Sequence, residues 1–186
     1  MREPSPANKR RKRVPKPLDE TRLRDLALSY VARFATSAGK LEQYLKRKLR
    51  ERGWEGEDEP DLAVLVARYI ELGYIDDTAY ARARSGDLLR RGYGPRRIAQ
   101  ALGQAGIDEE TRGHVAADQS ELRQAALHLA RKRRFGPFAT RPVDRALREK
   151  HLAAMVRAGH GFDIARAVID AASEDEAEDW VRDICD

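Results

Sequence analysis

Cysteine is almost absent from the sequence. The one such residue, Cys185, lies near the C-terminal end, so no disulfide can form within the chain and no thiolate cage can hold a metal ion. Long apolar runs are absent too. None approaches the roughly 20 residues that cross a bilayer, and the first residues lack the apolar core of a signal peptide. We therefore expect a cytoplasmic protein in a reducing compartment, with no membrane association.

Aromatic residues are also scarce. They make up 6% of the 186 residues, and β-branched residues are few beside alanine, leucine, arginine and glutamate. Because alanine, leucine, arginine and glutamate favour helices, whereas β-branched and aromatic residues favour strands, this composition predicts an all-α protein.

Charged residues are plentiful, at 36% of the chain, and their net charge is +5. Residues 1–17 carry seven lysines or arginines against Glu3, whereas residues 174–186 carry seven carboxylates against Arg182, so the two ends cancel. The net positive charge therefore belongs to residues 18–173. A basic body favours a polyanionic partner, although a charged helix face is often only solvated.

Apolar residues recur at helical spacing from Leu18 onward, and the pattern itself repeats. Two apolar positions stand eight and four residues before a helix-ending glycine in two places: Leu45 and Leu49 before Gly53, and Ile98 and Leu102 before Gly106. Residues 157–162, RAGHGF, give a similar stop in the last third of the chain. Tandem units of this kind, whose neighbours complete each other's cores, predict an elongated array rather than a globule.

The pattern divides the chain into five segments. We expect a disordered basic arm, three helical units with three helices each, and an acidic tail. Their predicted bounds are 1–17, 18–74, 75–119, 120–172 and 173–186, in that order.

Catalytic and metal-binding motifs are missing. The four histidines match no helical metal-ligand spacing, and Asp76 and Asp77 stand where a helix begins, which is typical of capping residues. Gly92 and Gly94 form a GxG, but no strand precedes them and no third glycine or Walker lysine comes after them. We therefore expect no catalytic residue, no metal site and no cofactor.

An aromatic residue, a glycine and a proline stand together twice, each time after an arginine-rich helix end. Residues 90–95 read RRGYGP, and residues 132–137 read KRRFGP. The aromatic ring can pack into a core, the glycine allows a sharp turn, and proline is tolerated at the first position of a helix. The motif therefore predicts a repeated connector between helices.

Basic residues gather on the second helix of the first unit and around both connectors. Because they recur at corresponding places, they are candidates for a stripe that faces phosphates or an acidic protein surface, as an alternative to solvated helix ends. The candidate contact residues are Lys46, Arg47, Arg50, Arg90, Arg91, Arg96, Arg97, Arg131, Lys132, Arg133 and Arg134.

Three segments resemble the RecX family of bacterial recombination regulators: KLEQYLKRKLRERGW at 40–54, LVARYIELGYIDDTAYARA at 65–83 and GYGPRRIAQALGQAGID at 92–108. The resemblance covers about residues 22–172. It implies a curved array of three three-helix repeats and a non-enzymatic modulator of RecA. Family members lodge in the groove of the RecA filament on single-stranded DNA and repress ATP hydrolysis, strand exchange and coprotease activity.

Other functions remain open at this point. Residues 96–107 also resemble the reader helix of a helix-turn-helix transcription regulator, which would require a dimerisation element and a preferred operator. An enzyme would require an assembled catalytic site. The partners expected from the resemblance are RecA and its filament, with weak nonspecific DNA binding by a monomer.

Overall fold

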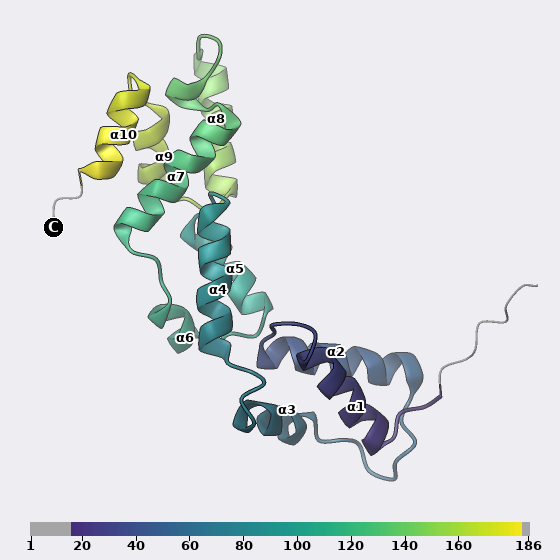
Figure 1. Ribbon diagram of the computed structural model, residues 1–186. Helices are drawn as coiled ribbons and strands as arrows, with labels where there is room; N and C mark the ends of the chain where they lie inside the picture. Colours follow the sequence, from purple (N-terminus) through teal and green to yellow (C-terminus); the bar gives the residue numbers. More distant parts are fainter. Residues whose placement is uncertain (1–15, 184–186) are drawn as a thin grey trace, which may run out of the picture.

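The computed structural model describes residues 16–183 and is built from helices (Figure 1). This part of the chain contains ten α-helices and one short 3-10 helix, and its only β pairing is an isolated bridge between Leu18 and Trp54. The predicted all-α class is confirmed. The predicted basic arm falls almost wholly, and Cys185 wholly, outside the described residues.

The first unit has three helices and a core of its own. Each helix begins after a residue whose side-chain oxygen accepts a hydrogen bond from the first turn, namely Asp19, Ser37 and Asp61. Leu18 is fully buried in this core and fixes the entering chain, because its N–H donates to the carbonyl of Gly53 at 2.9 Å. The helices are α1 (Glu20–Val31), α2 (Ala38–Arg52) and α3 (Leu62–Glu71).

The second unit has the smallest core, with six buried residues against ten in each of the other two. Its last helix is one reason, since none of the six residues of that helix is buried. Because its core is small, we expect the second unit to depend on its neighbours for stability. Its helices are α4 (Asp77–Arg90), α5 (Pro95–Gln104) and α6 (Glu109–His114).

The third unit is the largest, because the segment predicted as an acidic tail contributes a helix to it. Ala177 is fully buried in the third core, and Trp180 packs against the same core. The guanidinium of Arg123 lies 4.6 Å from the Trp180 ring centroid. The elements are α7 (Gln119–Arg133), the 3-10 helix η1 (Gly136–Phe138), α8 (Arg145–Arg157), α9 (Phe162–Ile169) and α10 (Glu174–Arg182).

The units succeed one another along a bent, elongated path, with α4 in the middle and with α1–α3 and α7–α10 at opposite ends (Figure 1). The predicted elongated, curved array is thereby confirmed.

The two connectors lead into different elements. Gly94 and Pro95 lead directly into α5, whereas Gly136 and Pro137 form η1, and α8 begins only at Arg145.

Candidate functional site at the joints between units

The first connector holds the second unit against the third. The N–H of Gly94 donates to the carbonyl of Ala158 at 2.9 Å, and the N–H of Arg96 donates to the carbonyl of Gly159 at 3.2 Å. A Cβ atom on Gly94 would overlap the backbone of Gly159 and His160. Gly94 is therefore required by the close approach of two backbones, and we call this contact the second joint.

His160 closes the second joint from inside. Its side chain is fully buried, and Nε2 lies 2.9 Å from the carbonyl oxygen of Gly92. Burial lowers the pKa of His160, although the hydrogen bond to Gly92 opposes the shift. The ring is therefore neutral near pH 7, with Nε2–H donating to that carbonyl. Its Nδ1 has no hydrogen-bond partner among the described residues.

A matching contact, the first joint, holds the first unit against the second. The hydroxyl of Ser37 donates to the carbonyl of Ala105 at 2.5 Å, and the N–H of Ala38 donates to Oδ1 of Asp77 at 2.8 Å. Gly39 faces Gly106 so closely that a Cβ on either would lie 2.7 Å from the other's Cα. In both joints, the start of one unit's second helix docks on the glycine turn that ends the next unit's second helix.

Asp77 makes the first joint sensitive to charge. Burial raises the pKa of this carboxyl, the bond from Ala38 opposes the rise, and the nearby carboxylates of Asp108 and Asp76 add to it. Capping was the predicted role of Asp76 and Asp77. Asp76 caps α4 by accepting from the N–H of Ala79, whereas Asp77 bonds across the joint.

The candidate contact residues on α2 are largely paired within that helix. Nζ of Lys46 lies 2.6 Å from Oε1 of Glu42, and Nε of Arg47 lies 3.6 Å from Oε1 of Glu51. Arg50 is exposed and makes no ion pair with the residues that the structure describes. Exposed ion pairs of this kind contribute about 0–1 kcal/mol to stability, so an incoming anion can replace the glutamates as partners of these cations at low cost.

The candidates at the end of α4 lie on different surfaces. Nη2 of Arg91 pairs with Oδ2 of Asp87 at 3.2 Å and faces the third unit. Arg90 lines a separate hollow that also contains Glu121 and His128.

The candidates at the start of α5 flank the second joint. Arg96 and Arg97 are both exposed, and Nη1 of Arg97 donates to the side-chain oxygen of Gln100 at 2.9 Å. The Arg96 side chain has neither a hydrogen bond nor an ion pair to any described residue. A helix N-terminus already favours anions, so these two cations increase that preference.

The candidates at the end of α7 point in different directions. Arg131 pairs with Glu178 of α10, and its guanidinium carbon lies 5.2 Å from the Phe138 ring centroid. Arg134 adopts a left-handed backbone with φ of 56° and ends α7. Lys132 and Arg133 are exposed and form no ion pair within the described part of the chain.

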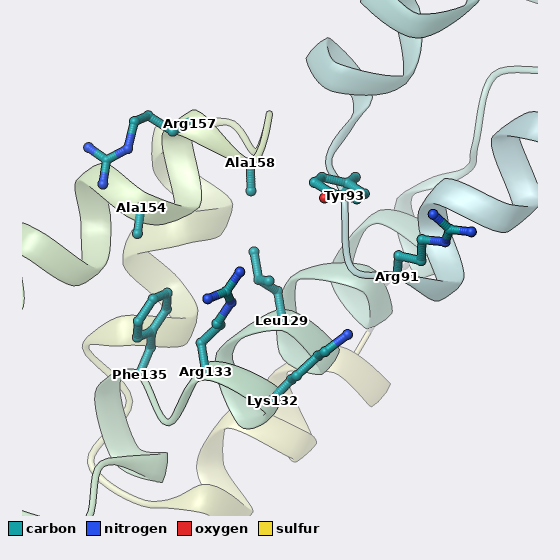
Figure 2. A pocket seen from close by; sticks show the side chains of 9 residues that line it. All are labelled: Arg91, Tyr93, Leu129, Lys132, Arg133, Phe135, Ala154, Arg157 and Ala158. Carbon is teal, nitrogen blue, oxygen red and sulfur yellow. The ribbon is translucent and has the colours of Figure 1, made fainter. Parts of the chain in front are cut away.

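Three of the candidates line one pocket beside the second joint. Arg91, Lys132 and Arg133 line a cavity of about 360 Å³. Figure 2 shows them with Arg157, which also lines the cavity and which the sequence analysis missed. Arg157 ends α8 directly before the glycine turn, and only the fold brings that turn beside the first connector. The floor and walls are apolar: Tyr93, Leu129, Phe135, Ala154 and Ala158.

The surface at the second joint combines cations with apolar and aromatic side chains. Within residues 16–183, no cluster of three or more His, Cys, Asp or Glu side chains could hold a metal ion. In the same range, no helix has both the length and the apolarity needed to cross a membrane. What the second joint presents is a group of cations held on a helical frame.

The fold and this surface define a class of protein: an all-α array of small helical units that presents cations beside its second joint. Comparison with known proteins gives the particular family. The model of the second three-helix domain of RecX matches residues 76–113. A regulatory protein RecX from Myxococcus xanthus is 34% identical over 177 residues, which are 90% of this chain and 95% of that protein. The chain belongs to the RecX family of regulatory proteins.

Other relatives agree with this assignment. The regulatory protein RecX of Halorhodospira halophila is 34% identical over 83% of this chain and 90% of its own length. The crystal structure of RecX from Lactobacillus salivarius matches with a TM-score of 0.62 at 19% identity, over 88% of this chain and 97% of that chain. This structural likeness supports the fold, and the sequence identities support the family.

Proposed function

We propose that this protein regulates RecA, mainly as an inhibitor, by binding along the groove of the RecA filament on single-stranded DNA. The observation that carries the proposal is the match to a regulatory protein RecX over 90% of the chain. A cytoplasmic monomer that meets RecA and DNA in the same compartment fits this role.

The elongated frame supports binding to several filament subunits at once. The close backbone contacts at both joints hold the three units in a fixed arrangement in space, so contacts made by separate units act together. Several weak contacts linked in one rigid chain give avidity without any single strong site.

Repression is a consequence of bridging. A chain that spans neighbouring RecA subunits opposes the relative movement that accompanies ATP turnover, and thus represses ATP hydrolysis, strand exchange and coprotease activity together. The exposed cations at the second joint would face DNA phosphates or acidic RecA surfaces, with weak and nonspecific binding to free DNA as a consequence.

A titration of the protein into RecA assembled on single-stranded DNA tests the proposal. We expect ATP hydrolysis to fall well before the protein reaches the concentration of RecA. Unchanged hydrolysis and unchanged filament length at equimolar protein would refute it. Variants with disrupted joints provide the control. Units that are no longer held in a fixed arrangement should inhibit far less than the intact array.

A further inference from the structure

We propose that the pocket lined by Tyr93, Lys132, Arg133, Phe135 and Arg157, here called the joint pocket, binds one nucleotide unit of single-stranded nucleic acid. The phosphate lies among the cations, and the base stacks on Tyr93. The proposal deepens the proposed function by naming a ligand class and a place. The proposal rests on the proposed function in one respect, since that function explains why the protein encounters single-stranded DNA.

The cations of the joint pocket are not neutralised by the protein. Arg91 pairs with Asp87, but Lys132, Arg133 and Arg157 are exposed and form no ion pair with any other residue in the described range. No carboxylate lines the pocket between residues 16 and 183. Like charges that border a space of about 360 Å³ repel one another, and a bound phosphate relieves that repulsion.

The walls of the joint pocket are held before any ligand arrives. Tyr93 sits between Gly92, whose carbonyl receives the bond from His160, and Gly94, which bonds to Ala158. The N–H of Tyr93 also donates to the carbonyl of Leu88 at 3.0 Å. The joint pocket lies where backbone hydrogen bonds hold two units together. Ligand binding therefore requires little ordering of the protein.

The two aromatic rings of the joint pocket have different roles. Phe135 is already stacked on His151, with centroids 4.6 Å apart and planes 26° apart, so that ring serves as a wall. Tyr93 is half-buried, and its ring stacks on no other ring of the described chain. Figure 2 shows Tyr93 on the connector, opposite the end of α8 that carries Arg157 and Ala158. Tyr93 is therefore the ring available to a base.

This combination favours single strands over the other polyanions. A duplex keeps its bases stacked inside and offers only phosphates, and an acidic peptide offers carboxylates without a flat aromatic surface. An unpaired nucleotide offers both a phosphate and an exposed π face, which is how single-stranded nucleic acid is generally recognised without sequence preference.

The test measures binding of a fluorescein-labelled oligothymidylate to the full chain without RecA, by anisotropy across salt concentrations. We expect Lys132→Ala/Arg133→Ala to weaken binding about tenfold at low salt. Because the pocket holds one phosphate, the slope of log affinity against log salt should fall by about 0.7. The matched control is Arg82→Ala/Arg166→Ala, which removes two exposed arginines that do not line the pocket. Equal losses in both double variants would overturn the proposal.

A second measurement tests the base. An abasic strand of equal length should bind the unaltered protein several-fold more weakly than oligothymidylate, and Tyr93→Leu should remove that difference. Tyr80→Leu is the control, because Tyr80 also packs against the second core but lies outside the pocket. Equal binding of the abasic strand, or displacement by polyglutamate as effective as by oligothymidylate, would show a general anion surface and overturn the nucleotide site. RecA inhibition can persist in either case.

Discussion

The two joints share one design but are sealed by different chemistry. In both, the start of one unit's second helix meets the glycine turn of the next unit's second helix. Side chains seal the first joint, through the Ser37 hydroxyl and the Asp77 carboxylate. Backbone groups and a buried His160 seal the second. Backbone approach thus sets the shape of the array, while the side chains set the charge and pH response of each joint.

The charges around the joints differ as well. Asp76, Asp77 and Asp108 lie near the first joint, whereas Arg96, Arg97 and the cations of the joint pocket surround the second. Two contacts of the same backbone geometry therefore offer opposite surfaces to a charged partner. The second is the one suited to phosphates or to an acidic protein face.

The largest expected effect comes from a methyl group placed in the second joint. Gly94→Ala would push a Cβ into the backbone of Gly159 and His160, which cannot yield as a flexible side chain could. We expect a loss of about 1–3 kcal/mol in the free energy of unfolding, measured by denaturant titration. Gly113→Ala is the control, since a Cβ there meets nothing within 4 Å. It should leave stability unchanged or raise it slightly. Equal changes in the free energy of unfolding for the two variants would show that the backbones at the second joint are not closely packed.

Removal of the Ser37 hydroxyl tests the first joint. Ser37→Ala leaves the carbonyl of Ala105 without its 2.5 Å bond and removes the oxygen that accepts from the N–H of Lys40. We expect a loss of about 1–2 kcal/mol, because a buried acceptor and a helix cap are lost together. If Ser37 holds the first joint together, protection from hydrogen exchange should fall at residues 101–107 as well as at the start of α2. A loss confined to α2 would contradict it.

Acidification should weaken the second joint selectively. Burial lowers the pKa of His160 below its ordinary value of 6.5, so stability is complete above pH 6.5 and falls as the pH drops toward the lowered pKa, because only the unfolded chain takes up the proton. The pKa of Asp77 is raised above its ordinary value of 3.8, so the stability that depends on its protonated form is lost as the pH rises through the raised pKa.

Hydrogen exchange at pH 7 and pH 5 separates the two joints. We expect lower protection factors at residues 92–98 and 158–161 at pH 5, after correction for the slower intrinsic exchange at that pH, with little change at residues 37–41. Burial also lowers the pKa of His151, so His151→Gln is the comparison variant and should retain the response at the second joint. His160→Gln should lose it. If the second joint still responds to pH in His160→Gln, another titratable group causes the response.

Neutralisation of Arg96 and Arg97 should have the smallest effect on stability. Both side chains are exposed, so Arg96→Ala/Arg97→Ala should change the free energy of unfolding by less than about 0.5 kcal/mol and leave helical content unchanged. Binding to the RecA filament should weaken and depend less on salt. An unchanged salt slope would assign these arginines to a solvated face.

Sequence patterns were sufficient to predict the all-α class and the glycine stops after α2, α5 and α8, but not the contacts between units. Apolar spacing and glycine stops predicted the array, because each helix buries a stripe of its own residues. The docking of Gly94 on Gly159 joins positions 65 residues apart, and no local pattern encodes such a distance. Arg157 was missed for the same reason, since only the fold brings the end of α8 to the first connector.

The acidic segment shows a second limit. Its charges suggested a tail, yet Ala177 and Val181, spaced one helical turn apart, are buried as α10 packs on the third unit. Two apolar residues among many carboxylates are a weak signal, so tertiary packing decided the structure there.

Co-sedimentation with RecA on single-stranded DNA, across salt concentrations, tests most directly that the second joint faces the filament. We predict that the unaltered protein sediments with RecA and single-stranded DNA together. Lys132→Ala/Arg133→Ala and Arg96→Ala/Arg97→Ala should each require lower salt to do so, whereas Arg82→Ala/Arg166→Ala should behave as the unaltered protein. Sedimentation that is the same for all variants at every salt concentration would contradict the assignment of the filament-binding surface to the second joint.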